Sequence, residues 1–112
     1  MRQPTFFDKT DGEPDPERVV LYALGEFQAR GKVLAERDLP LDRLRGALRR
    51  AADSFGVAEL DDERAVALFG ALGAHVRRVP AFFAKHPYRV TVPPQLAARA
   101  RDFYDERIGR KG

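Results

Sequence analysis

The residues with the clearest chemical potential in this sequence are the basic side chains of its second half. Residues 64–101 hold seven Lys and Arg and no Asp or Glu, in a chain with 20 basic and 17 acidic residues. Residues 1–63 have a net negative charge, with ten basic and 14 acidic side chains, and residues 102–112 carry three of each sign. Arg, which outnumbers Lys by 16 to 4, presents a planar fork that matches phosphate and carboxylate. The acid-free stretch is therefore the candidate for an anion-binding surface.

Aromatic side chains lie among these cations, and exposed bases stack on aromatic rings. The candidate residues for binding anions or nucleic acid are Arg77, Arg78, Lys85, Tyr88, Arg89 and Arg99. In this hypothesis the five cations contact phosphate and Tyr88 stacks on a base. The ordinary alternative is a solvated surface whose cations pair with the acidic first half, within one chain or across a dimer. The two alternatives differ in whether the cations converge on one face without Asp or Glu partners.

A second basic group lies opposite the leucine stripe of the segment 41–55. Its members are Arg43, Arg45, Arg49 and Arg50. A charged and solvent-exposed helix face is the usual explanation of such a group, so we expect these arginines to be exposed.

Residues that could support catalysis or bind a metal are few. Ser54 is the only serine and has no Gly-x-Ser-x-Gly context, and His75 and His86 lack the His-Glu-x-x-His spacing of zinc enzymes. The chain has no cysteine, which excludes thiol catalysis, thiolate metal sites and disulfides. The acidic run 61–63 is explained by capping of a helix N-terminus. We therefore expect no enzymatic activity, no metal and no cofactor.

Helices are the elements that the hydrophobic spacing predicts for most of the chain. The first begins at residues 15–17, where Asp, Pro and Glu suit a helix start, and either ends at Gly31 or continues toward residue 39. The second covers residues 41–55 and ends at a glycine. The third begins at residues 60–63 and carries an apolar face as far as Val79, directly before a proline.

The remaining segments are shorter. Residues 81–84 predict a further helical piece, and residues 88–92 alternate and are β-branched, which predicts a short extended segment. One strand cannot form a sheet alone, so it must lie along the helices or pair with a partner chain. A fourth helix follows Pro94. The predicted fold is all-α, a bundle of four main helices with one short extended segment near 88–92.

A helix-turn-helix with its turn at Leu72-Gly73 and a reading helix over 76–83 is disfavoured. The helix before the turn would need a small residue where Phe69 stands, and Pro80 falls inside the reading helix.

The length of 112 residues suits one domain, which we place at 15–112 behind an irregular N-terminal arm at 1–14. No apolar run is long enough to span a bilayer, and the N-terminus lacks an apolar signal stretch, so we expect a cytoplasmic protein that does not enter membranes. The leading hypothesis is a small, non-catalytic interaction or regulatory protein that self-associates or serves as a subunit of a larger complex. The alternative is a nucleic-acid-binding protein that uses residues 64–101.

Overall fold

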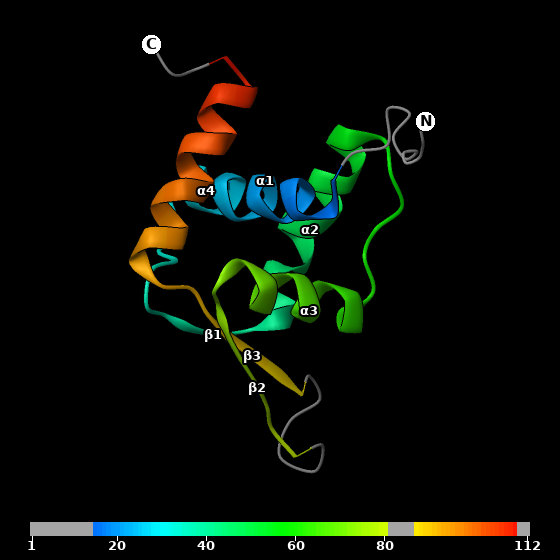
Figure 1. Ribbon diagram of the computed structural model, residues 1–112, viewed down its shortest axis with the longest axis vertical. Coiled ribbons are helices and arrows are strands. Elements are labelled where there is room, and N and C mark those ends of the chain that lie inside the picture. Colours follow the sequence, from blue (N-terminus) through cyan, green and yellow to red (C-terminus); the bar gives the residue numbers. More distant parts are fainter. Residues whose placement is uncertain (1–14, 81–86, 110–112) are drawn as a thin grey trace, which may run out of the picture.

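The computed structural model describes residues 15–80 and 87–109 (Figure 1). The elements are α1 (Pro16–Ala29), β1 (Asp38–Pro40), α2 (Leu41–Phe55), α3 (Asp62–Leu72), β2 (His75–Arg78), β3 (Tyr88–Thr91) and α4 (Pro94–Arg107). The three strands form one antiparallel sheet in the order β1-β3-β2. The fold is thus α+β, and the prediction of an all-α bundle is wrong. The arm predicted at 1–14 and the helical piece predicted at 81–84 lie outside the described residues.

The first helix, α1, is the central helix of the fold. The Asp15 side chain caps it by accepting a hydrogen bond from the Glu17 N–H at 3.0 Å, and Pro16 occupies its first turn. The helix ends at Ala29 with Arg30 as its C-cap, and the following Gly31 has a φ of 87°, a left-handed conformation that glycine adopts readily. Its continuation past Gly31, which the sequence left open, does not occur. Helix α1 contacts α2, α3 and α4, and its residues 19–27 are buried except Tyr22, which is half-buried.

The second helix agrees with its prediction. Helix α2 spans residues 41–55, its Leu44 and Leu48 are buried, and Gly56 ends it in the left-handed conformation at φ 72°. A spacing of three and four residues places these leucines on the side that faces α1.

The third helix is shorter than predicted. Asp61 caps α3 by accepting a hydrogen bond from the Arg64 N–H at 2.8 Å, as the acidic run suggested. The helix ends at Gly73, which has φ 109°, and the Ala74 N–H donates back to the Phe69 carbonyl at 2.9 Å. The chain then reverses into β2, so the predicted continuation to Val79 is wrong.

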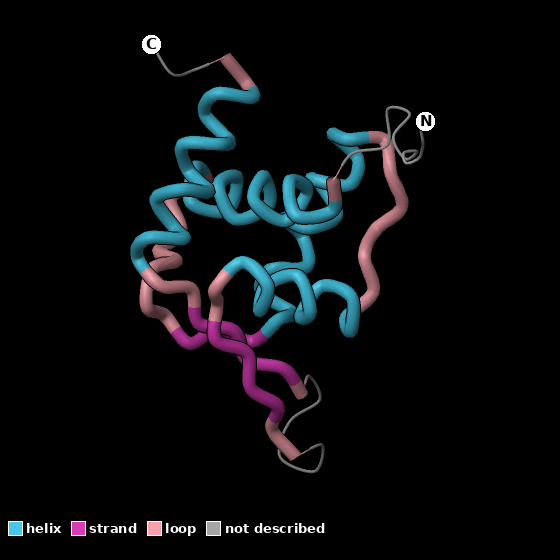
Figure 2. The backbone as a smooth tube through the Cα atoms, viewed as in Figure 1, coloured by secondary structure: helices cyan, strands magenta, loops and turns pink. Residues whose placement is uncertain are grey.

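The short extended segment is the middle strand of the sheet. In the register of the sheet Val90 lies opposite Leu39 of β1 on one side and Val76 of β2 on the other. The expectation that this strand stays alone or needs a partner chain is therefore wrong, because both its neighbours come from the same chain. Figure 2 shows the strands together at one end of the molecule, beyond the helices.

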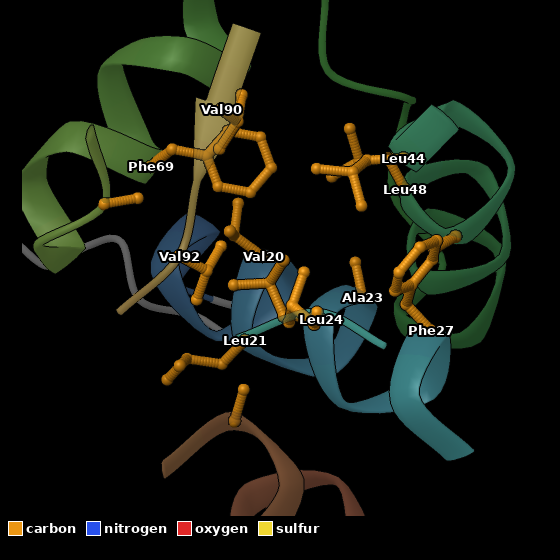
Figure 3. Packing of buried hydrophobic residues seen from close by; sticks show 14 of the residues in the cluster. Val20, Leu21, Ala23, Leu24, Phe27, Leu44, Leu48, Phe69, Val90 and Val92 are labelled. Carbon is orange, nitrogen blue, oxygen red and sulfur yellow. The ribbon is translucent and has the colours of Figure 1, made fainter. Parts of the chain in front are cut away.

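One hydrophobic cluster joins the helices to the inner face of the sheet (Figure 3). Its largest fully buried side chains are Phe69, Leu24, Leu34, Leu44, Leu48, Val20, Val90 and Val92. Phe69 from α3 and Val90 from β3 lie side by side in this cluster, above Val20 of α1. Full burial of one such side chain contributes roughly 1.5–3 kcal/mol, so these contacts hold the sheet against the helices.

A buried carboxylate links α1 to α2. Glu26 is 7% exposed, and it accepts hydrogen bonds from Arg50 Nε at 2.7 Å, Arg50 Nη2 at 2.9 Å and Arg30 Nε at 2.6 Å. Burial raises the pKa of this carboxyl, but the hydrogen bonds from Arg50 and then Arg30 outweigh it, and the pKa lies below its ordinary value. Arg50 is therefore a half-buried partner of an interior carboxylate and not simply a member of an exposed face.

A second arginine of α2 also has structural partners. Arg45 donates to the Leu60 carbonyl at 2.7 Å, to Glu59 Oε2 at 3.2 Å and to Asp62. These bonds hold the loop 56–61 and the start of α3 against α2. Arg49 also pairs with Glu59, at 3.6 Å, so three of the four arginines expected on an exposed face have partners on neighbouring elements.

No helix in the described parts of the chain, 15–80 and 87–109, is long and apolar enough to cross a membrane.

Candidate functional site

The β2–β3 hairpin holds most of the predicted anion-binding residues but distributes them over two faces. Side chains alternate along a strand, and residues opposite each other in a sheet share a face. Val76 lies opposite the buried Val90 and marks the inner face. Arg77, which lies opposite Arg89, therefore faces outward, whereas Arg78 returns to the inner side. Two arginines that are adjacent in the sequence thus point to opposite sides of the sheet.

On the outer face, both arginines are paired with one carboxylate. Arg77 Nη2 donates to Asp38 Oδ2 at 2.8 Å, and Arg89 donates from Nε to the same oxygen at 3.4 Å and from Nη2 to the Asp38 carbonyl at 3.1 Å. The hydrogen bond from Arg77, aided by the charge of Arg89, holds the pKa of Asp38 below its ordinary value. The acidic first half of the sequence therefore supplies a partner to the basic second half.

On the inner face, the aromatic candidate is engaged by α3. The Tyr88 hydroxyl donates to Glu63 Oε2 at 3.0 Å, and this hydrogen bond raises the pKa of Tyr88. The guanidinium of Arg78 lies over the Tyr88 ring, 5.5 Å from its centroid. In this arrangement one face of the ring is covered by a cation from its own chain.

The other two candidates do not extend this group. Arg99 lies on α4, in a groove of about 360 Å³ beside the start of α1, and the groove also contains Asp15, Glu17, Asp102 and Glu106. Lys85 lies outside the described residues. The described candidate cations, Arg77, Arg78, Arg89 and Arg99, therefore do not converge on one face.

A second hollow, of about 300 Å³, lies where α2, α3 and the hairpin meet. It contains Arg45 and Arg49 but also Asp42 and Asp62, with Tyr88 at its border. Because the charges balance and Arg45 is bonded to Asp62, this hollow has no net preference for an anion.

The exposed side of α3 is a surface that the charge pattern did not indicate. Residues 65–74 contain no charged or hydrogen-bonding side chain, yet on α3 only Ala65 and Phe69 are buried. Ala67, Gly70 and Ala71 are exposed, at a spacing of three and four residues that places them on one side of the helix. We call these three residues the α3 face. The uncharged run is visible in the sequence, but its exposure is not.

The described residues contain no group of three or more His, Asp or Glu side chains that could hold a metal ion. His75 is exposed on the outer face of β2, opposite Thr91, and His86 lies outside the described residues.

Comparison with known proteins gives this chain no relative: no family model, no curated protein and no solved structure matches it.

Proposed function

We propose that this protein is a small, non-catalytic interaction protein that associates with a second copy of itself through the α3 face. The observation that carries the proposal is an uncharged helix face, exposed to solvent, on a chain whose composition is 33% charged. In the same proposal the protein acts in the cytoplasm, where a chain without cysteine needs no disulfides.

A second copy fits this face because of its symmetry. A two-fold axis sets each surface against itself, so residues near the axis meet their own copies. Ala67, Gly70 and Ala71 can do so without like-charge repulsion. Glu63 and Arg64 lie at the start of the helix, and an antiparallel pair of α3 helices separates them from their copies.

The size of the face sets the expected strength. A helix of 11 residues is about 16 Å long, and small side chains let two helix axes approach closely. Such a contact buries less than the roughly 800 Å² per partner of a standard interface. We therefore expect a dimer that dissociates in the micromolar range.

The test compares two alanine-to-arginine variants by light scattering over a range of concentrations. Ala67→Arg places a charge at the α3 face, where the helix tolerates it because Glu63 lies four residues earlier. Ala98→Arg places the same charge on an exposed position of α4. The proposal expects Ala67→Arg to stay monomeric while Ala98→Arg dimerises like the unmodified protein. Equal behaviour of the two variants would overturn it.

A second candidate, nucleic-acid binding, is favoured by one observation, the order of the elements. Two helices, α2 and α3, joined by the loop 56–61 and followed by the hairpin β2–β3, have the topology of winged helix-turn-helix domains, a class with DNA-binding members. Topology alone does not assign function. Here α3, which would enter the major groove, offers no base-reading side chain between residues 65 and 72, and its first two residues, Asp62 and Glu63, are acidic.

Binding of labelled duplex DNA at two salt concentrations separates the two candidates. Contacts from about five cations to phosphates would weaken the affinity by a few orders of magnitude between about 50 and 200 mM salt. Our proposal expects no binding with this steep dependence. Salt-dependent binding that is lost in the double variant Arg77→Ala, Arg78→Ala would favour the second candidate.

A further inference from the structure

The outer edge of the sheet is a second surface of this chain that can bind a partner, and it is independent of the α3 face. Strand β2 is an edge strand, because the order β1-β3-β2 leaves one of its sides without a neighbouring strand from residues 15–80 or 87–109. His75, Arg77 and Arg78 are exposed. The backbone of an edge strand presents N–H and C=O groups to which an extended chain can pair.

Two hydrogen bonds identify the backbone groups that point outward. The Val79 N–H donates to the Pro87 carbonyl at 2.6 Å, and the Glu36 N–H donates to the Val92 carbonyl at 2.7 Å on the other side of β3. Residues of an antiparallel ladder alternate between bonded and non-bonded pairs. Val79 and Arg77 therefore face β3, and the N–H and C=O groups of Val76 and Arg78 face away from it.

The described residues supply no partner for these outward groups. After the bond of the Ala74 N–H, the next backbone hydrogen bond outside the helices and strands is that of the Val79 N–H. None of these bonds includes the N–H or C=O of Val76 or Arg78. We define these four backbone groups as the β2 edge.

Charge decides what kind of strand fits the β2 edge. Arg77 is paired with Asp38, but among the described residues Arg78 forms no ion pair with a carboxylate, and its guanidinium lies over the ring of Tyr88. Residues directly opposite in adjacent strands lie about 5 Å apart, so like charges repel and opposite charges attract. A second copy of β2 would bring arginines against arginines. An acidic strand would be attracted.

We propose that the β2 edge binds an extended acidic segment of a partner protein by adding it as a fourth strand. In an antiparallel pairing the segment places acidic residues opposite Arg78 and Arg77 and an apolar residue opposite Val76. Opposite Val76 the added side chain lies on the inner face, where Val90 is buried. The sequence pattern that fits is acidic, acidic, apolar.

The probe is a labelled peptide, acetyl-Ser-Thr-Glu-Glu-Val-Thr-Ser-amide, measured by fluorescence polarisation with the full chain. Arg78→Glu should weaken its binding about fivefold or more, because an opposite-charge pair becomes a like-charge pair. Arg99→Glu, the same change at an exposed position of α4, should leave the affinity unchanged. The α3 variant Ala67→Arg should also bind normally, which separates this proposal from self-association.

Methylated peptides test the backbone pairing itself. N-methylation of the first Glu and of the Val removes donors that point to the β2 edge and should weaken binding about tenfold or more. N-methylation of the second Glu removes a donor that points away and should be tolerated. In the amide exchange of the protein, the Val76 and Arg78 N–H groups should slow when the unmethylated peptide binds, while Arg77 stays as it was.

Absence of binding by the unmethylated peptide would overturn the proposal. So would equal binding of the two methylated forms, or an effect of Arg78→Glu no larger than that of Arg99→Glu. Binding without protection of the Val76 and Arg78 amides would also overturn it, since it would indicate attraction to the arginines without strand addition.

Discussion

Arg50 of α2 donates hydrogen bonds from two nitrogens to the carboxylate of Glu26 of α1, at 2.7 Å and 2.9 Å, and this carboxylate is buried in the interior. Arg30, one turn after Glu26 on the same helix, adds a third bond but is itself half exposed. Only the Arg50 contact crosses between helices. The link is therefore expected to stabilise the packing of α1 on α2.

Arg50→Ala should lower the free energy of unfolding by about 3 kcal/mol, because it leaves a buried carboxylate without its main partner. Arg30→Ala removes a more exposed pair within one helix and should lower it by only about 0.5 kcal/mol. Urea denaturation of both variants measures the difference. Equal losses would contradict the role assigned to Arg50.

The stability should also decrease in acid through Glu26. Its pKa in the folded protein lies below its ordinary value, so the unfolded chain binds a proton more readily than the folded one. The stabilisation is present at pH values above the ordinary pKa of Glu, about 4.3, and is lost as the pH falls through the folded value. The free energy of unfolding, from denaturation curves measured between about pH 6 and pH 3, should depend less on pH in Glu26→Gln than in the unmodified protein. An unchanged pH dependence in that variant would contradict this assignment.

Gly25 should be required where α1 crosses α4. A Cβ at this position would overlap the Ala100 carbonyl and the Tyr104 Cβ, which belong to the neighbouring helix. Gly25→Ala should therefore destabilise the protein by about 1–3 kcal/mol despite the higher helix propensity of alanine.

Gly70→Ala is the matched control for this change. No atom lies within 4 Å of a Cβ at Gly70, so alanine should stabilise α3 by roughly 0.5–1 kcal/mol. Thermal unfolding of both variants at low protein concentration measures the two effects. Stabilisation by Gly25→Ala would contradict the close crossing of α1 and α4, and destabilisation by Gly70→Ala would contradict the open space at Gly70.

Asp38 should reduce the positive charge that the outer face of the sheet offers to phosphate. It holds Arg77 and Arg89 together, and Asp38→Asn removes its negative charge while keeping its size. We expect this variant to bind duplex DNA more strongly than the unmodified protein at low salt. The difference in affinity should disappear at high salt. Unchanged binding would show that the pairing does not limit contacts with phosphate.

The sequence was sufficient for elements that local signals define. The Asp15 cap, the run of leucines in α2 and the glycine at residue 56 each act over a few residues, and the helices that they predict are present. The strand near Val90 was also predictable from its alternation.

The sheet was not predictable in the same way, because long-range pairing decides it. Val76 and Val79 fit the face of a longer third helix as well as a strand, and only pairing with β3 selects the strand. The segment Asp38–Pro40 has no strand signal of its own and is extended because it pairs with the same strand. The placement of the candidate site residues was not predictable for a related reason, since the alternation of a strand separates Arg77 from Arg78.

The measurement that tests self-association most directly is a distance between the two α3 helices. The chain has no cysteine, so Ala71→Cys and Ala98→Cys each provide a single attachment point for a nitroxide label. Electron spin resonance at high protein concentration should detect coupling between two copies labelled at residue 71, with a separation below roughly 30 Å, since facing helices of this length lie no farther apart. Absence of that coupling, or a shorter separation for labels at residue 98, would contradict the account.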